Sequence, residues 1–112
     1  MNASALEKLC MGLPGATVDI KWGHDRCFLV GKKMFCVTGM DGPYSVSFKA
    51  PPEEFGLLIE RNGIIPAPYS ARYHWVMVED PNALRPAEWR RLIEQSYELV
   101  KGKLPSKIRD NL

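Results

Sequence analysis

The chain has 112 residues, of which 46% are hydrophobic and 25% are charged, and this composition is that of a globular and not a disordered protein. The length suits one domain, so we expect a single domain over residues 1–112. A formal net charge of +2 identifies no class of partner by itself. No apolar run approaches the roughly 18 residues of a membrane span. No signal peptide is visible either, so we expect a cytoplasmic protein without membrane contact.

The three cysteines, Cys10, Cys27 and Cys36, are odd in number and lie in apolar surroundings. Their spacing matches no zinc-binding pattern, and neither histidine is close to them in sequence. We therefore predict three reduced thiols that pack in the interior, with no disulfide and no metal. Reduced thiols are typical of a cytoplasmic protein.

The first predicted helix begins near Ser4. Ser4 and Glu7 have the spacing of a capping box, in which each side chain accepts a hydrogen bond from the backbone N–H of the other residue. The apolar residues that follow have helical spacing and form one stripe: Leu6, Leu9, Cys10 and Leu13. Pro14 and Gly15 end the helix. A helix with one such stripe predicts a sheet for it to cover.

Four short segments rich in β-branched and aromatic residues follow, and each predicts a strand: residues 17–22, 26–30, 34–38 and 44–49. The turns between them are short and contain glycine, which favours antiparallel pairing, because parallel strands need long crossover connections. In the fourth strand Val46 and Phe48 alternate with polar residues. That pattern is typical of a strand with one buried and one solvated face.

The stretch Ile64–Glu79 organises the second half of the chain. Pro66 and Pro68 exclude a helix and a central strand, so they predict an extended connection. Residues 74–79 then alternate as a fifth strand, and we expect the side opposite Trp75 to be buried. The Trp75 side carries aromatic and basic neighbours, which fit either a packed edge of the core or a binding surface.

Helices are predicted on both sides of this stretch, over residues 51–61 and 87–101. The last helix has a strong apolar stripe: Trp89, Leu92, Ile93, Ser96, Tyr97 and Val100. On its outer face we expect Arg90 with Glu94, and Arg91 with Glu98, to neutralise each other. The predicted fold class is α+β with two layers, a five-stranded antiparallel sheet with the first and last long helices on one face.

The sequence shows no catalytic constellation. His24 and His74 could each act as a general base beside a carboxylate, but no nucleophile motif, HExxH motif or phosphate-binding glycine loop is present. Glu7, Asp19 and Asp25 are too scattered to suggest a metal site. We therefore predict a protein that is not an enzyme and has no cofactor.

Basic residues occur at positions suited to phosphate contact. They are Lys32 and Lys33 in a hairpin turn, Lys49 at the end of a strand, and Arg72 beside Tyr69, Tyr73 and His74. Lysine and arginine in turns can neutralise phosphates, and aromatic rings can stack on unpaired bases. Lysines in turns can equally be just solvated, and the residues alone leave both interpretations open.

Several short motifs occur in the order found in one known family. They are LCMGLPGA at 9–16, KWG at 21–23, GKKMF at 31–35, VSFK at 46–49, IPAPY at 65–69, HWV at 74–76, SYELV at 96–100 and LP at 104–105. On these residues the chain resembles the MmcQ/YjbR family over nearly its whole length. The resemblance implies a CyaY-like fold with a double-wing arrangement, and DNA binding.

We therefore expect a small bacterial DNA-binding protein, monomeric and without metal. The expected nucleic-acid-binding residues are Lys32, Lys33, Lys49, Tyr69, Arg72, His74 and Trp75. CyaY and frataxin proteins bind iron through an acidic first helix, whereas the first helix here has Glu7 as its one acid, so we do not expect iron binding. The alternative is a non-catalytic module that binds a protein or a small ligand at the aromatic surface around Tyr69 and Trp75.

Overall fold

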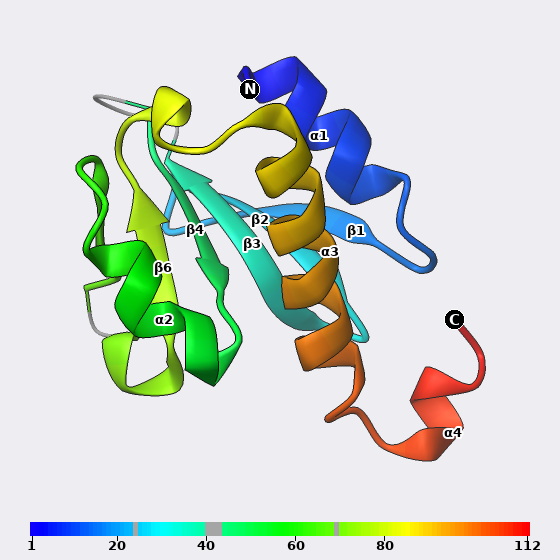
Figure 1. The fold of residues 1–112 in the computed structure, drawn as a ribbon. Helices are drawn as coiled ribbons and strands as arrows, with labels where there is room; N and C mark the ends of the chain where they lie inside the picture. The colour runs from blue at the N-terminus through cyan, green and yellow to red at the C-terminus, as the bar shows by residue number, and fades with distance from the viewer. Residues whose placement is uncertain (24, 40–43, 69) are drawn as a thin grey trace.

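A computed structural model describes residues 1–23, 25–39, 44–68 and 70–112. Its centre is a six-stranded, fully antiparallel sheet with the strand order β1-β2-β3-β4-β6-β5 (Figure 1). The strands are β1 (Thr17–Lys21), β2 (Asp25–Val30), β3 (Lys33–Gly39), β4 (Val46–Lys49), β5 (Ile64–Pro66) and β6 (Trp75–Val78). The antiparallel pairing predicted from the short turns is confirmed for the first four strands.

The three longest helices, α1 (Ala3–Met11), α2 (Pro52–Ile59) and α3 (Pro86–Lys101), lie on one face of this sheet (Figure 1). The chain also has a short helix, α4 (Ser106–Arg109), and 3₁₀ turns η1 (Ala71–Tyr73) and η2 (Pro81–Ala83). Helix α3 packs on β3 and β4, α2 packs on β5 and β6, and α1 lies beside α3. Two layers with α1 and α3 on the same face match the prediction.

The predicted count of five strands is wrong, because the Ile64–Pro66 segment is a strand and not just an extended connection. This segment, β5, pairs with β6, with Ile64 opposite Val78 and Pro66 opposite Val76. It lies at the edge of the sheet. Proline is compatible with an edge strand, because its missing N–H need not leave a neighbouring strand unpaired.

The core lies between α3 and the centre of the sheet. Trp89 packs edge-on against Phe48, with ring centroids 6.3 Å apart, and Tyr97 packs edge-on against Phe35 at 5.5 Å. Leu92 and Ile93 are fully buried between these aromatic pairs along the helix. The predicted burial of Trp89, Leu92 and Ile93 is confirmed, whereas Val100 is only half-buried.

Ser96 is a buried polar residue on the same stripe, and it joins two strands. Its hydroxyl donates to the carbonyl of Phe35 (2.6 Å) and accepts from the backbone N–H of Lys49 (3.0 Å). The regular β3–β4 pairing ends at Cys36 and Phe48, so the hydroxyl bridges the strands one residue beyond that point. Both of its hydrogen-bonding functions are used, which is how a buried hydroxyl avoids a desolvation cost.

The cap of α1 differs from the predicted box. Asn2 is the N-cap, and its side-chain oxygen accepts from the N–H of Ala5 (2.8 Å). Glu7 instead accepts from Arg26 of β2 across 2.8 Å. Asn2 has the right side chain and stands one residue before the helix, so Glu7 is free to tie α1 to the sheet.

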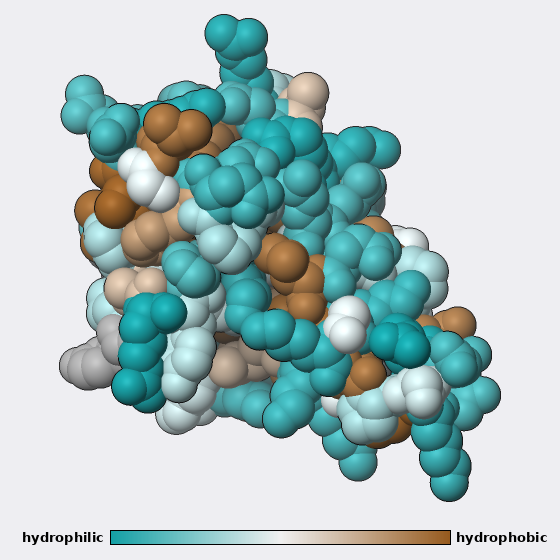
Figure 2. Space-filling view, turned by 60° about the horizontal axis from the view of Figure 1, so that its bottom comes forward, coloured by the Kyte–Doolittle hydropathy of each residue, from teal (hydrophilic) through white to brown (hydrophobic). Residues whose placement is uncertain are grey.

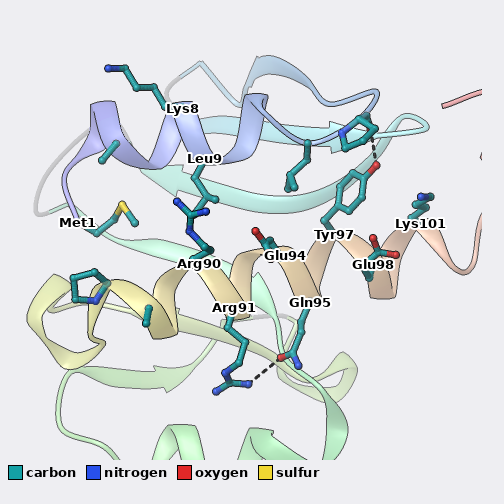
Figure 3. Close-up of a pocket in the computed structure, with 15 residues that line it drawn as sticks. Met1, Lys8, Leu9, Arg90, Arg91, Glu94, Gln95, Tyr97, Glu98 and Lys101 are labelled. Carbon is teal, nitrogen blue, oxygen red and sulfur yellow. Dashed lines mark hydrogen bonds between the residues drawn. The ribbon is translucent and has the colours of Figure 1, made fainter.

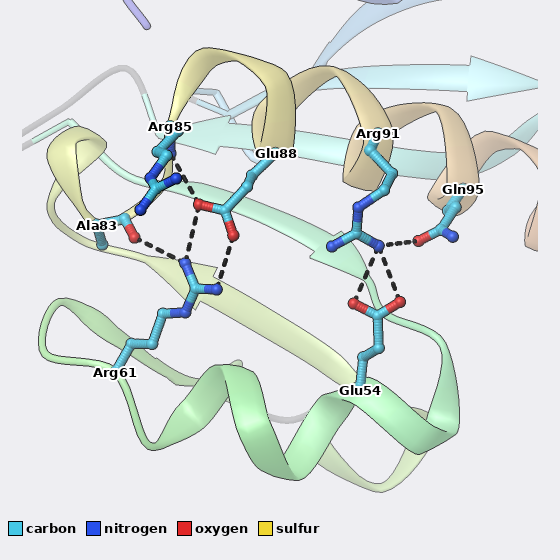
Figure 4. Close-up of polar contacts among 7 residues, drawn as sticks. All are labelled: Glu54, Arg61, Ala83, Arg85, Glu88, Arg91 and Gln95. Carbon is cyan, nitrogen blue, oxygen red and sulfur yellow. Dashed lines mark hydrogen bonds and ion pairs between the residues drawn. The ribbon is translucent and has the colours of Figure 1, made fainter.

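Polar contacts also join α2 to α3 (Figure 4). Arg91 contacts both carboxylate oxygens of Glu54, at 2.9 and 3.1 Å, and also Gln95. Arg61, just after α2, makes a two-pronged contact with Glu88. The acid that neutralises Arg91 therefore comes from α2, and not from Glu98 within the same helix.

The opposite face of the sheet carries no helix in the described part of the chain. Its side chains are mostly half-buried by one another, and they include Leu29, Val37, Ser47, Trp75 and Met77. The Val76 and Val78 side of β6 is fully buried, as predicted. Among the described residues, no helix combines the length and the apolar character needed to cross a bilayer.

Candidate nucleic-acid interface

Three strand ends meet at one end of the sheet. Strand β3 begins at Lys33, β4 ends at Lys49 and β6 begins at Trp75. The three strands are neighbours and alternate in direction, so these ends lie side by side. Lys49 is directly opposite Trp75 in the β4–β6 register. Four of the predicted residues, Lys32, Lys33, Lys49 and Trp75, are thus brought to the same end of the molecule.

The β2–β3 turn is held in place by the C-terminal segment. Gly31 and Lys32 form its centre with φ of 55° and 67°, the mirror-image geometry that suits a two-residue hairpin turn. A Cβ atom added at Gly31 would lie 2.5 Å from Leu104 Cδ1 and 3.3 Å from Ile108 Cγ2. The turn therefore packs tightly against the start of α4, while Lys32 and Lys33 stay exposed.

Lys49 has a second lysine, Lys103, as its neighbour. Partial burial lowers the pKa of Lys49, and the nearby Lys103 ammonium lowers it further. Two neighbouring ammonium groups repel each other when both are charged, and an anion placed between them would relieve that repulsion. Lys103 was not predicted as part of the site, because it lies far from Lys49 in the chain and no local pattern connects the two residues.

The basic end is the name used below for five lysines: Lys32, Lys33, Lys49, Lys103 and Lys107. Lys107 belongs to α4, whose Ile108 lies against Gly31, and it is exposed. Figure 2 turns this end of the molecule forward and shows a mainly hydrophilic surface with separate apolar patches. Two carboxylates on adjoining segments have basic neighbours of their own, since Glu54 contacts Arg91 and Asp110 lies 3.8 Å from Arg109.

Arg72 and His74 flank this end with different surroundings. The guanidinium of Arg72 lies over the Tyr73 ring, 4.8 Å from its centroid, and both residues are exposed. His74 ends η1 in the left-handed region with φ of 66°, and its ring packs edge-on against Phe55 of α2 at 5.6 Å. Arg72 is therefore accessible to a ligand, whereas His74 has a packing contact with α2.

Trp75 is half-buried on the open face of the sheet, beside Lys49. Tyr69, the other aromatic residue predicted for the site, lies outside the described residues. Of the aromatic surface predicted around these two residues, the structure therefore describes Trp75. Trp75 lines neither of the two hollows described below.

A groove of about 980 Å³ runs between α1 and α3 (Figure 3). Leu9, Leu13 and Tyr97 contribute apolar surface, and the Tyr97 hydroxyl donates to the carbonyl of Pro14. Its charged lining is of mixed sign: Lys8, Arg90, Arg91, Glu94, Glu98 and Lys101. Four of these groups are basic and two are acidic, and Arg91 is already paired with Glu54, so the charge of the groove is a weak guide to the ligand it would take.

A smaller hollow of about 260 Å³ lies beside the N-terminal half of α1, and Leu6, Arg26, Phe28 and Tyr44 contribute to its lining. The Tyr44 hydroxyl is buried without a hydrogen-bond partner among the described residues. Burial and the nearby thiols of Cys36 and Cys10 raise its pKa to about 12. At this pKa the tyrosine is a neutral hydrogen-bond donor at neutral pH and not a nucleophile.

All three cysteines are buried, as predicted. Burial and a hydrogen bond with Cys10 raise the pKa of Cys36, and burial also raises the pKa of Cys27. Raised values disfavour the thiolate, which is the reactive and metal-binding form. In the described part of the chain, no three His, Cys, Asp or Glu side chains are placed to hold a metal ion together.

Comparison with known proteins gives one family. The sequence profile of the YjbR family matches residues 11–99. The fold is similar to that of the crystal structure of protein DR2400 from Deinococcus radiodurans, which is described as a DUF419 domain. The TM-score is 0.88 and the sequence identity 24%, over 98% of this chain and 86% of that one.

The fold is also similar to that of a protein from Pseudomonas syringae, with a TM-score of 0.73 and 23% identity, over 88% of this chain and 98% of that one. No curated protein matches. At these identities the two structures support the fold alone, whereas the family profile covers most of the chain. The protein therefore belongs to the YjbR family.

Proposed function

We propose that the protein binds DNA through the phosphates of its backbone, at the basic end. The observation that carries the proposal is the gathering of lysines at one end of the sheet, where Lys33 begins β3 and Lys49 ends the neighbouring β4, with Lys103 close to Lys49. A phosphate between Lys49 and Lys103 would satisfy both ammonium groups. Contacts of this kind depend on charge and not on base sequence, so we propose binding with little sequence preference.

The β2–β3 turn supplies the next contacts. Gly31 packs against Leu104 and Ile108, so the exposed Lys32 and Lys33 are presented on a turn with a fixed position. A fixed position lowers the entropy lost when a lysine meets a phosphate. We propose that this turn acts as a wing against a DNA groove, with Arg72 and Trp75 at the far side of the same end.

A double-wing arrangement is also part of the proposal, with the two hairpins that share β2 as its wings. The β1–β2 and β2–β3 hairpins both contain β2, so their turns lie at opposite ends of that strand. Both turns therefore cannot enter one groove side by side. We assign phosphate contact to the β2–β3 turn, which carries the lysines, within a CyaY-like fold.

We also propose a cellular setting. Three buried thiols with free sulfhydryl groups suit a reducing compartment, so we propose a cytoplasmic protein. The two similar crystal structures are of proteins from bacteria, which supports a bacterial source.

The test is a titration of a short labelled duplex at several salt concentrations. Log affinity should fall with log salt at a slope of about −0.9 for each phosphate contact, hence roughly −3 to −4 for four contacts. Lys32→Ala with Lys33→Ala, and separately Lys49→Ala with Lys103→Ala, should each reduce the slope by about two and weaken binding equally across sequences.

The matched control is Lys8→Ala with Arg90→Ala. These two exposed residues belong to α1 and α3, line the groove of Figure 3, and carry the same charge as each lysine pair. The control should leave the slope unchanged. Undetectable binding of the wild type at low salt, or equal losses for control and test pairs, would contradict a phosphate site at the basic end. A partner at the Tyr69–Trp75 surface would then be the better hypothesis.

A further inference from the structure

Strand β1 leaves one edge of the sheet open. It is the first strand in the order and pairs with β2, and its other edge is unpaired in the described part of the chain (Figure 1). The N–H of Ile20 bonds to the side-chain oxygen of Asp19 (2.8 Å) and so points away from β2. Because backbone direction alternates along an antiparallel strand, the N–H and C=O groups of Val18 point outward too.

The two faces of this edge differ in chemistry. Asp19 is directly opposite Cys27 in the β1–β2 register, and Lys21 lies two residues further along β1, so both share the face of the sheet that Cys27 occupies. Val18 and Ile20 point to the other face, where they are 40% and 49% exposed. The turn that follows adds Trp22, which is 64% exposed and has a positive φ of 55°. Apolar residues at such exposure on an open strand edge mark an interaction surface.

We propose that this edge pairs with the same edge of a second copy of the chain, antiparallel, with Ile20 opposite Ile20. The two Ile20 residues would exchange N–H and C=O hydrogen bonds. Asp19 of each copy would face Lys21 of the other, and Val18 would lie beside the turn that contains Trp22. The two sheets would then form one continuous sheet, which departs from the monomer expected from the sequence.

Charge selects this register. A shift of two residues in one direction puts Asp19 opposite Asp19 of the second copy, and a shift in the other direction puts Lys21 opposite Lys21. Like charges directly opposite each other destabilise a strand pair. A shift by one residue would align outward-pointing with inward-pointing backbone groups and would reverse the two faces. In the proposed register Lys21 lies between Asp25 of its own hairpin and Asp19 of the second copy.

Dimer formation replaces each hydrogen bond that it breaks. Ile20 gives up its bond to the Asp19 side chain and gains a backbone carbonyl, and the released carboxylate gains Lys21. Strand edges bury little area, so the dimer should be weak and dependent on concentration. The β2–β3 turn lies at the opposite end of β2 from Trp22, so pairing would leave the basic end accessible.

The test uses two charge variants, Asp19→Lys and Lys21→Asp, in the full chain. Each variant alone would place like charges opposite each other at both contacts, so its dimer dissociation constant should rise about tenfold or more over the wild type. An equal mixture of the two variants restores opposite charges at both contacts. Sedimentation velocity with one variant labelled should therefore show a mixed dimer, which a folding defect could not produce.

Cross-linking gives an independent readout. Ile20→Cys should form a disulfide between copies under mild oxidation, because residues opposite each other in a sheet are close enough to be bridged. Thr17→Cys is the matched control, since Thr17 is exposed on the same strand but would lie far from its counterpart. At a protein concentration of about 1 mM, a dimer with a dissociation constant of about 1 mM would be half-formed. A wild type that is still monomeric at this concentration would overturn the proposal. So would single variants that associate like the wild type, or a mixture that forms no mixed dimer.

Discussion

The two hairpins that share β2 differ in what lies behind their turns. At the β2–β3 turn the space beside Gly31 is filled by Leu104 and Ile108 from the C-terminal segment. At the β1–β2 turn a Cβ added to Gly23 would meet no atom of the described residues within 4 Å. The first turn presents lysines from a supported position, and the second ends a strand with an open edge. The β2–β3 turn, the candidate phosphate contact, is therefore supported by the C-terminal segment. The β1–β2 turn, next to the candidate pairing edge, lacks such support among the described residues.

The same contrast holds along the strands. Residues of β2 are buried from Cys27 to Val30, whereas most of β1 is exposed, although the two strands are paired throughout. Helix α3 contacts β2, β3 and β4 and so provides the support for one hairpin. Changes at Ile93 and at the two turn glycines should break or sharpen this contrast, and a change at Glu88, outside both hairpins, should leave it intact.

The largest effect is expected from Ile93→Ala, which removes support from the covered hairpin. Ile93 is fully buried in α3, and the lost side chain leaves a cavity, so unfolding free energy should fall by about 2–5 kcal/mol. Urea unfolding measures this. The neighbouring exposed residue gives the control, Glu94→Ala, which should change stability by less than about 0.5 kcal/mol. A wild-type midpoint for the Ile93 variant would mean that α3 does not support the sheet through this residue.

Gly31→Ala and Gly23→Ala compare the two turns directly. Both positions have positive φ, of 55° and 76°, so an alanine should cost about 1–2 kcal/mol of backbone strain at either one. At Gly31 the added methyl also meets the end of the Leu104 side chain, which can shift, so overpacking should add about 1 kcal/mol, the lower end of its usual range. Thermal or urea unfolding should therefore show the greater loss for Gly31→Ala. Equal losses would indicate that the C-terminal segment does not press on the β2–β3 turn.

Much of this architecture is predictable from local patterns. The apolar stripe of the last helix predicted the burial of Trp89, Leu92 and Ile93, because helical spacing fixes which side chains share a face. The short glycine turns predicted antiparallel strands for the same kind of reason. These features depend on residues close together in sequence, where spacing alone determines geometry.

Features that depend on distant residues were not predicted. Strand β5 has only three residues and includes Pro66, so its composition did not predict a strand. It is a strand because it pairs with β6, which lies further along the chain. The Lys49–Lys103 pair joins a strand end to the segment after α3, and no local pattern connects them. His74 was predicted as a binding residue from its sequence neighbours, and its edge-on contact with Phe55, 19 residues away, was not predicted.

The smallest effect is expected from acid, at a contact that belongs to neither hairpin. Arg61 and then the Arg85 backbone N–H stabilise the Glu88 carboxylate and lower its pKa from 4.5 to about 2 (Figure 4). The folded state therefore holds this proton more weakly than the unfolded state does. The contact contributes stability fully above about pH 4.5, and the contribution is lost as pH falls towards 2.

Glu88→Gln isolates that contribution. The Arg61 side chain is 42% exposed, so solvent screening should limit the loss at neutral pH to about 1 kcal/mol or less. Between about pH 4.5 and 2 the difference in unfolding free energy between wild type and variant should shrink, because the wild-type carboxylate becomes neutral in that range. Denaturant unfolding at several pH values measures this difference. If the difference in unfolding free energy stayed constant across this pH range, the contact with Arg61 would not lower the pKa of Glu88. NMR signals of the two turns should not change in Glu88→Gln at neutral pH, because the contact joins α3 to the end of α2 and includes no residue of either hairpin.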